Sequence, residues 1–163
     1  MRGIVAYDSV HGNTKQVAEA IAEQMRADGH LVEIFNLKEA IPKSVAGDLM
    51  FIGSPTRGGR MTSRVKDFLE GLDLEYWRNR PIVLFDTIGP FSKDLEKRKK
   101  WLALADEGGK NAASKMQELC QSRGLGNCSK KLHLAVTGFM GPLAPDALSI
   151  AREFTHEFLT TMK

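Results

Sequence analysis

Cysteine is scarce in this sequence, and its pattern matches no metal site. Cys120 and Cys128 are the only two among 163 residues. Two thiols are too few for a disulfide framework, and their spacing does not match a zinc-binding pattern. We therefore expect buried or idle thiols in a reducing compartment, and no metal.

Long apolar runs and a strong excess of charge are also absent. The N-terminal apolar run Gly3–Tyr7 ends at Asp8, which is too short for a signal peptide. No stretch approaches the roughly 20 apolar residues of a membrane span. The net charge of +3, with an isoelectric point near 8.9, is too small to indicate binding to nucleic acid or to a membrane surface. We expect a cytoplasmic protein that binds neither.

The sequence does contain a regular alternation of apolar runs and amphipathic stretches. The runs predict strands, and the helical spacing of apolar residues predicts helices. The expected strands are Gly3–Tyr7, Leu31–Leu37, Asp48–Gly53, Pro81–Phe85 and Leu132–Thr137, and the expected helices are Thr14–Gly29, Met61–Leu72, Ala112–Gln121 and Pro145–Leu159. This α/β pattern indicates one domain, residues 1–163, with a parallel sheet covered by helices on both faces.

The connection after the fourth expected strand is unusually long. Residues 88–111 lie between that strand and its helix, whereas such connections usually contain about 2–6 residues. Because Lys93–Ala105 has helical character of its own, we interpret the segment as an inserted helix.

Ligands of parallel α/β sheets bind beyond the carboxyl ends of the strands, and the loop after the first strand has the composition of an anion site. Its sequence is Ser9-Val10-His11-Gly12-Asn13-Thr14. Amide groups at a helix start and the helix dipole both favour negative charge. Ser9 and Thr14 add hydroxyl donors, and Gly12 permits close approach to a ligand. The loop contains no Lys or Arg, so we expect it to retain a phosphate rather than transfer it.

Two further loops follow the third and fourth strands. The first, Ser54-Pro55-Thr56-Arg57-Gly58-Gly59, is rich in glycine and can lie against a flat ligand. The second begins Asp86-Thr87-Ile88-Gly89 and also consists largely of small residues.

Together the three loops resemble those of the flavodoxin family, single-domain proteins that bind flavin mononucleotide (FMN). Residues 9–14 are similar to the family's phosphate loop, with His11 where a hydroxyl residue is usual. Residues 54–59 are similar to the loop that wraps the isoalloxazine ring, and residues 86–89 fall where the third loop would be. The resemblance covers nearly the whole chain. It implies a three-layer flavodoxin-like sandwich with a five-stranded parallel sheet in the order 2-1-3-4-5.

The resemblance also implies roles for individual residues. The first loop would bind the phosphate, Thr56 and Arg57 would lie beside the ring, and Gly58 matches the glycine whose carbonyl turns toward the flavin N5 when that atom gains a proton. No residue is expected to be catalytic. The expected FMN-binding residues are Ser9, Val10, His11, Gly12, Asn13, Thr14, Ser54, Pro55, Thr56, Arg57, Gly58, Gly59, Thr87, Ile88 and Gly89.

Simpler interpretations of these residues stay open. Ser9, Asn13 and Thr14 are also good helix caps. His11 and Arg57 could be solvated surface residues.

Two features depart from the family pattern. Many flavodoxins carry an aromatic or apolar residue at Arg57, and Ser54–Arg57 is similar to the loop of flavodoxin-like NAD(P)H:quinone reductases. The inserted segment Lys93–Lys100 contains five basic and two acidic residues. It is either a solvated helix face or a docking patch for an acidic redox partner. Phe91 and Trp101 flank it, and either could pack the insertion or stack on the flavin.

The sequence therefore leaves two functions open for a monomer or homodimer. One is an electron carrier, and the other is an FMN-dependent NAD(P)H or quinone reductase. A phosphoacceptor receiver domain is disfavoured because the third strand ends in Gly53, where an acceptor Asp is required. A dinucleotide-binding domain is disfavoured because Gly-x-Gly-x-x-Gly is absent.

Overall fold

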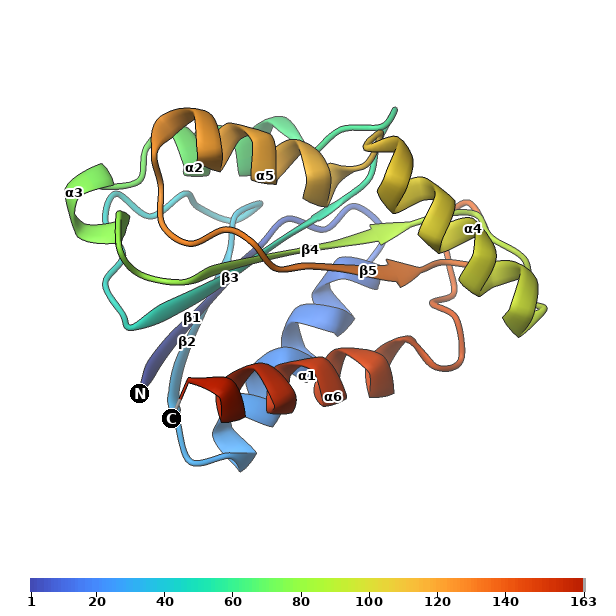
Figure 1. Cartoon of the computed structure of the whole chain (residues 1–163), viewed down its shortest axis with the longest axis horizontal. Coiled ribbons are helices and arrows are strands. Elements are labelled where there is room, and N and C mark those ends of the chain that lie inside the picture. Colours follow the sequence, from blue (N-terminus) through green and yellow to red (C-terminus); the bar gives the residue numbers. More distant parts are fainter. Residues whose placement is uncertain (163) are drawn as a thin grey trace.

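The computed structural model describes residues 1–162 as a three-layer α/β sandwich (Figure 1). Its central sheet has five parallel strands in the order β2-β1-β3-β4-β5. This order confirms the fold expected from the sequence. The strands are β1 (Arg2–Tyr7), β2 (Leu31–Asn36), β3 (Leu49–Pro55), β4 (Ile82–Ile88) and β5 (Lys131–Ala135).

Helices cover both faces of the sheet. On one face lie α1 (Asn13–Ala27) and α6 (Ala147–Thr161), and on the other lie α2 (Ser63–Glu70), the short α3 (Leu74–Trp77) and α5 (Ala112–Arg123). The inserted helix α4 (Leu95–Gly108) lies beside β5, at the end of the sheet toward which β4 and β5 point (Figure 1).

The central strands are buried because both of their faces are covered. β1, β3 and β4 are almost entirely inaccessible, which explains the apolar runs Gly3–Tyr7, Leu49–Gly53 and Ile82–Phe85 within them. Alternate residues of β3 enter different cores. Phe51 packs toward α1 and α6, where it meets Phe158 edge-on at 5.8 Å between ring centroids. Met50 and Ile52 pack toward α2 and α5.

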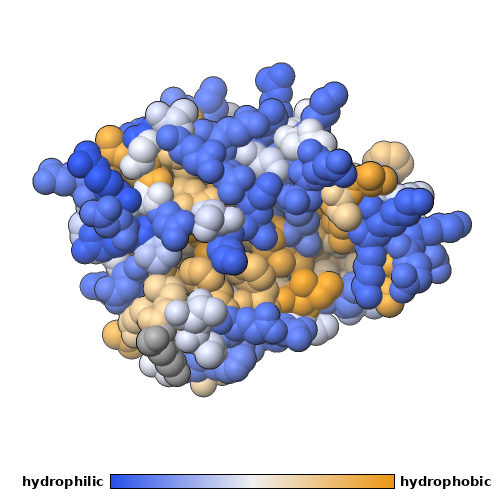
Figure 2. All heavy atoms as spheres, viewed as in Figure 1, coloured by the Kyte–Doolittle hydropathy of each residue, from blue (hydrophilic) through white to orange (hydrophobic). Residues whose placement is uncertain are grey.

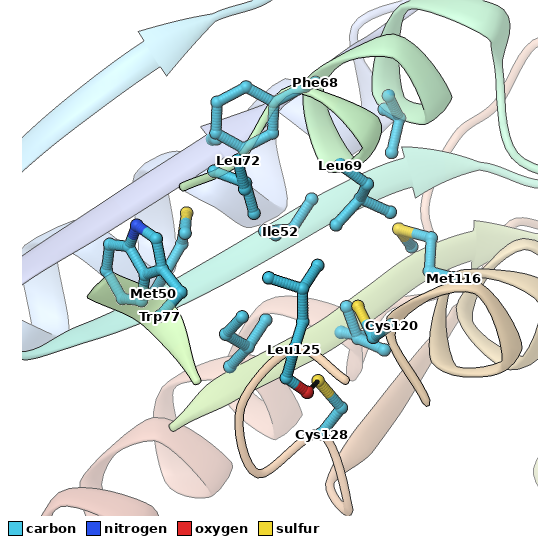
Figure 3. Packing of buried hydrophobic residues seen from close by; sticks show 14 of the residues in the cluster. Met50, Ile52, Phe68, Leu69, Leu72, Trp77, Met116, Cys120, Leu125 and Cys128 are labelled. Atoms are coloured by element: carbon cyan, nitrogen blue, oxygen red, sulfur yellow. Dashed lines mark hydrogen bonds between the residues drawn. The ribbon is translucent and has the colours of Figure 1, made fainter. Parts of the chain in front are cut away.

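The core beneath α2 and α5 also contains both cysteines. Figure 3 shows Cys120 and Cys128 among the apolar side chains of this core, next to Leu125. Both thiols are free and buried. A hydrogen bond with Cys128, together with burial, raises the pKa of Cys120. This environment leaves the Cys120 thiol protonated and unreactive.

Two differences from the expected elements bear on the site. β4 extends to Ile88, so Thr87 and Ile88 belong to the strand rather than to the loop. The short α3 was not expected from the sequence, since four residues are too few to show helical periodicity; it is capped by Asp73, which accepts a hydrogen bond from the Tyr76 amide at 3.1 Å.

The structure contains the inserted helix. It spans Leu95–Gly108 and therefore begins and ends later than the expected Lys93–Ala105. Its first turn is capped by Asp94, which accepts from the Lys97 amide at 3.1 Å. Its end is set by Gly109 in the left-handed conformation, with φ 70°. Within residues 1–162, no helix has both the length and the apolar character needed to cross a membrane.

Candidate functional site

A cleft at the carboxyl ends of the strands brings the three expected loops together. It lies next to the carboxyl end of β1. The neighbours of β1 in the sheet are β2 and β3, so this end of β1 is the topological switch point of the sheet. Ten of the fifteen expected site residues line it. The lining consists of Ser9, Val10, His11, Asn13, Thr14, Pro55, Thr56, Arg57, Thr87, Gly89, Val136, Gly138 and Phe139.

The first loop has the geometry of an anion cradle. Gly12 adopts φ 90° at the start of α1, a conformation that L side chains rarely adopt. The Ser9 hydroxyl accepts hydrogen bonds from the amides of Gly12 at 3.1 Å and Lys15 at 3.3 Å, which folds the loop back on itself. Among residues 1–162, no partner is found for the amides of Val10, His11, Asn13 and Thr14. These neutral donors fit a phosphate group.

Hydrogen bonds to two distant segments also hold the first loop in place. Thr14 is buried, and its hydroxyl shares a 2.8 Å hydrogen bond with the hydroxyl of Thr87 on β4. The Asn13 side-chain amide donates to the Met140 carbonyl at 3.2 Å. Contacts to two distant segments therefore hold the start of α1 in place.

The second loop turns back through its two glycines. The amide of Arg57 donates to the Arg60 carbonyl at 2.9 Å, and the reverse bond measures 3.1 Å. Gly58 and Gly59 lie between them with φ 57° and 78°, the positive values that a type I′ turn requires at both central positions. The turn itself accounts for both glycines, which lie outside the cleft lining. Arg57 is exposed at the rim.

Ser54 also lies outside the lining. Its side chain is buried, donates to the Pro55 carbonyl at 2.9 Å and accepts from the Thr62 amide at 3.1 Å. Its side chain therefore connects the end of β3 to the start of α2.

The third segment packs closely against Val136, the first residue after β5. A Cβ at Gly89 would lie 2.2 Å from the Val136 carbonyl oxygen, so only glycine fits there. Ile88 is buried outside the cleft lining, whereas Thr87 and Gly89 line it.

Sequence reasoning missed the loop after β5. Val136, Gly138 and Phe139 line the cleft, and Phe139 and Met140 are 90% and 70% exposed. This loop follows the carboxyl end of a strand, as the other three do, and the sequence Gly138-Phe139-Met140-Gly141 marks a turn carrying large apolar side chains. The rule that directed attention to the other loops applies equally to this one.

The basic run on α4 divides into two kinds of residue. Arg98 is buried and donates to Asp146 at 3.1 Å and to the carbonyls of Ser92 and Lys93 at 3.2 and 3.1 Å. Its neighbours Lys97 and Lys99 are exposed, and Figure 2 shows hydrophilic side chains gathered over α4. The exposed basic patch consists of Lys93, Lys97, Lys99 and Lys100.

The aromatic residues beside that patch pack on each other. The rings of Phe91 and Trp101 have centroids 6.3 Å apart, and neither residue lines the cleft. Phe91 is partly buried against the core that α1 and α6 cover, whereas Trp101 is 42% exposed.

Comparison with known proteins places the whole chain in a family. Residues 4–160 match a family model described as the flavodoxin domain. The chain belongs to the flavodoxin family. Its fold matches oxidised flavodoxin 1 of Bacillus cereus over 98% of both chains, with a TM-score of 0.66 and 17% identity. It also matches the rubredoxin oxygen:oxidoreductase of Desulfovibrio gigas over 95% of this chain and 34% of that one, with a TM-score of 0.60 and 16% identity. At these identities the likeness concerns the fold alone.

Curated relatives of this flavodoxin-family chain carry two different names. The NAD(P)H dehydrogenase (quinone) of Cupriavidus metallidurans is 31% identical over 88 residues, which cover 41% of this chain and 44% of that protein. The flavodoxin of Aquifex aeolicus is 34% identical over 76 residues, covering 45% of this chain and 41% of that protein. In both cases less than half of the relative is spanned.

Proposed function

We propose that the chain, residues 1–163, is a single domain that binds FMN non-covalently in the cleft and transfers electrons. The observation that carries this proposal is the set of four amides, at residues 10, 11, 13 and 14, that have no partner among residues 1–162, with Gly12 at φ 90°. They form an uncharged phosphate cradle at the switch point of a flavodoxin-family sheet. The expected ring-contacting residues Thr56 and Arg57 line the same cleft.

The protein's part in this function is to hold and tune the cofactor. When bound, FMN supplies the electron-transfer chemistry. The first loop would bind the phosphate, while Thr56, Thr87 and Gly89 would form walls beside the ring. The guanidinium of Arg57, at the rim, would favour negative charge on a reduced ring and so raise the midpoint potential.

Copurification tests the proposal most directly. We expect the purified protein to be yellow and to release FMN on denaturation, and we expect the apoprotein to quench FMN fluorescence at micromolar concentration. Riboflavin, which lacks the phosphate, should bind at least about tenfold more weakly because it leaves the four amides unpaired. The proposal fails if FMN neither copurifies nor binds. Equal affinity for riboflavin and FMN would show that the first loop does not bind the phosphate.

The proposed electron transfer has two alternatives. In the first the protein is an electron carrier, and in the second it is an FMN-dependent NAD(P)H:quinone reductase. Arg57 and the relatives named NAD(P)H dehydrogenase (quinone) favour the second. The assay is NADPH oxidation by the purified holoprotein with a quinone acceptor. A carrier gives almost no turnover unless a separate reductase is added, whereas a reductase turns over alone.

For the carrier, we further propose an acidic redox partner that docks on the exposed basic patch. Charges of one sign steer association with a partner of opposite sign. Reversing Lys97 and Lys99 to Glu should slow electron transfer from an acidic reductase and weaken its dependence on salt. The same reversal at Lys43 and Lys66, two exposed lysines outside the insertion, is the control and should leave the rate near wild type.

A further inference from the structure

A buried carboxylate lies behind the cleft and connects three segments. Asp86, on β4, is completely buried. Its Oδ2 accepts from the Thr56 hydroxyl at 3.2 Å and from the Ala113 amide at 3.1 Å. The Thr56 oxygen in turn accepts from the Ala112 amide at 2.9 Å. Asp86 therefore holds a residue of the cleft wall against the first turn of α5, where a negative charge is also favoured by the helix dipole.

The other oxygen of Asp86 faces a histidine on the neighbouring strand. His133 of β5 is paired with Asp86 in the sheet register, and its Nδ1 lies 2.8 Å from Asp86 Oδ1. Its Nε2 lies 2.8 Å from Oδ1 of Asp106 on α4. The row Asp106–His133–Asp86–Thr56 thus runs from the inserted helix to the cleft, across strands that are adjacent in Figure 1.

Both ring nitrogens of His133 face carboxylates, which sets its protonation. A neutral imidazole has one N–H and can donate to only one of them, whereas the imidazolium donates to both. Burial opposes the charged form, but the hydrogen bonds and charges of Asp86 and Asp106 outweigh that effect and raise the pKa of His133.

The other groups around His133 do not reverse this balance. Lys131, on the same strand, contacts Asp106 at 3.0 Å and the neutral Ser114 hydroxyl of α5 at 3.2 Å. From α6, the apolar Phe154 lines the same surface hollow as His133. Lys130 also lines that hollow. Among residues 1–162, the charged groups paired with His133 or with its two carboxylate partners are Asp86, Asp106 and Lys131.

We propose that His133 is a positioning residue for the cleft, acting through Asp86. In its imidazolium form it fixes the Asp86 carboxylate, which fixes Thr56 and the start of α5 against the bound FMN. Loss of the proton removes the His133 donor from one of the two carboxylates and loosens that wall. The inserted helix takes part through Asp106. This inference rests on the proposed binding of FMN.

The test measures FMN affinity of the apoprotein by fluorescence quenching from pH 6 to pH 9. We expect the FMN affinity of the wild-type protein to fall between pH 6 and pH 9. The affinity of His133→Gln should fall less, by a factor on the order of three to ten, because the effect corresponds to about one net hydrogen bond. His156→Gln, at an exposed histidine on α6, should keep the wild-type profile. The FMN phosphate ionises over the same pH range in the experiments with each variant. The difference between the wild-type and His133→Gln pH profiles therefore measures the effect of His133 alone.

A second variant and a direct measurement complete the test. Asp106→Asn removes the charge of a partly exposed carboxylate while leaving the Asp86 pair in place, and should shift the midpoint of the profile to lower pH. Histidine NMR of the apoprotein should show His133 protonated at pH 6. A wild-type profile in His133→Gln, or a neutral His133 at pH 6, overturns the inference. If the wild-type protein binds no FMN at any pH, the proposed function itself is wrong and this inference falls with it.

Discussion

Thr14 Oγ1 and Thr87 Oγ1 lie 2.8 Å apart in a buried hydrogen bond between the first residues of α1 and the end of β4. Thr14 is 1% exposed and Thr87 is 4% exposed, so the bond is largely shielded from bulk water. This bond joins two segments of the cleft wall that are far apart in the sequence.

A double-mutant cycle should reveal this coupling. Thr14→Val or Thr87→Val alone leaves a buried hydroxyl unpaired and should lower the free energy of unfolding by about 1–3 kcal/mol, with weaker FMN binding. The double variant should regain part of the stability, because valine has the shape of threonine and neither polar group remains. Urea unfolding measures this. Additive losses would contradict it. Thr160→Val, at an exposed site on α6, is the control.

The conformation of Gly12 gives a second prediction. A Cβ there would meet nothing within 4 Å, yet φ is 90°, so Gly12→Ala is penalised by the backbone alone, by about 1–2 kcal/mol. FMN affinity should fall with it, because the neighbouring amides shift. Gly108→Ala is the matched control, since that site is helical and equally open. It should be neutral or slightly stabilising. Equal effects of the two changes in urea unfolding would refute the explanation.

Arg98 should behave differently from the lysines around it. Arg98→Met removes three hydrogen bonds that hold α4 to the segment before it and to Asp146. We expect a loss of about 1–3 kcal/mol in unfolding free energy and faster tryptic cleavage within α4. Lys99→Met, at an exposed neighbour, should change stability by less than about 0.5 kcal/mol. A stable Arg98→Met protein would show that α4 is held by its apolar contacts alone.

The stability of the apoprotein should depend on pH through His133. Its pKa is raised in the folded state, so its contribution is complete below the unfolded value of about 6.5 and is lost as pH rises through the folded value. The stability difference between wild type and His133→Gln should therefore be larger at pH 6 than at pH 9. Chemical unfolding at both values measures it, with His156→Gln for comparison. A difference that grows with pH would contradict the assigned protonation.

Most of the fold follows from the sequence because parallel strands buried on both faces read as apolar runs, as β3 and β4 do. The conformation of the first loop could also be predicted, because Gly12 comes directly before the helical pattern of α1. The roles of Arg98 and Asp86 were not, because a buried charge looks like a surface charge until its partners are known. The partner of Arg98 is Asp146 and the partner of Asp86 is His133, and each pair is separated by more than 40 residues in the sequence.

The separation in sequence between hydrogen-bonded residues also determines when the cleft can form during protein synthesis. The first loop, residues 9–14, is synthesised before the groups that fix it, because Thr87 lies 73 residues after Thr14 and Met140 lies 127 residues after Asn13. The strands β2 to β5 lie between residue 13 and residue 140. A nascent chain therefore contains the residues of the first loop long before it contains the complete cleft. If FMN binds there as proposed, it can bind only after β5 and the loop that follows it have joined the sheet.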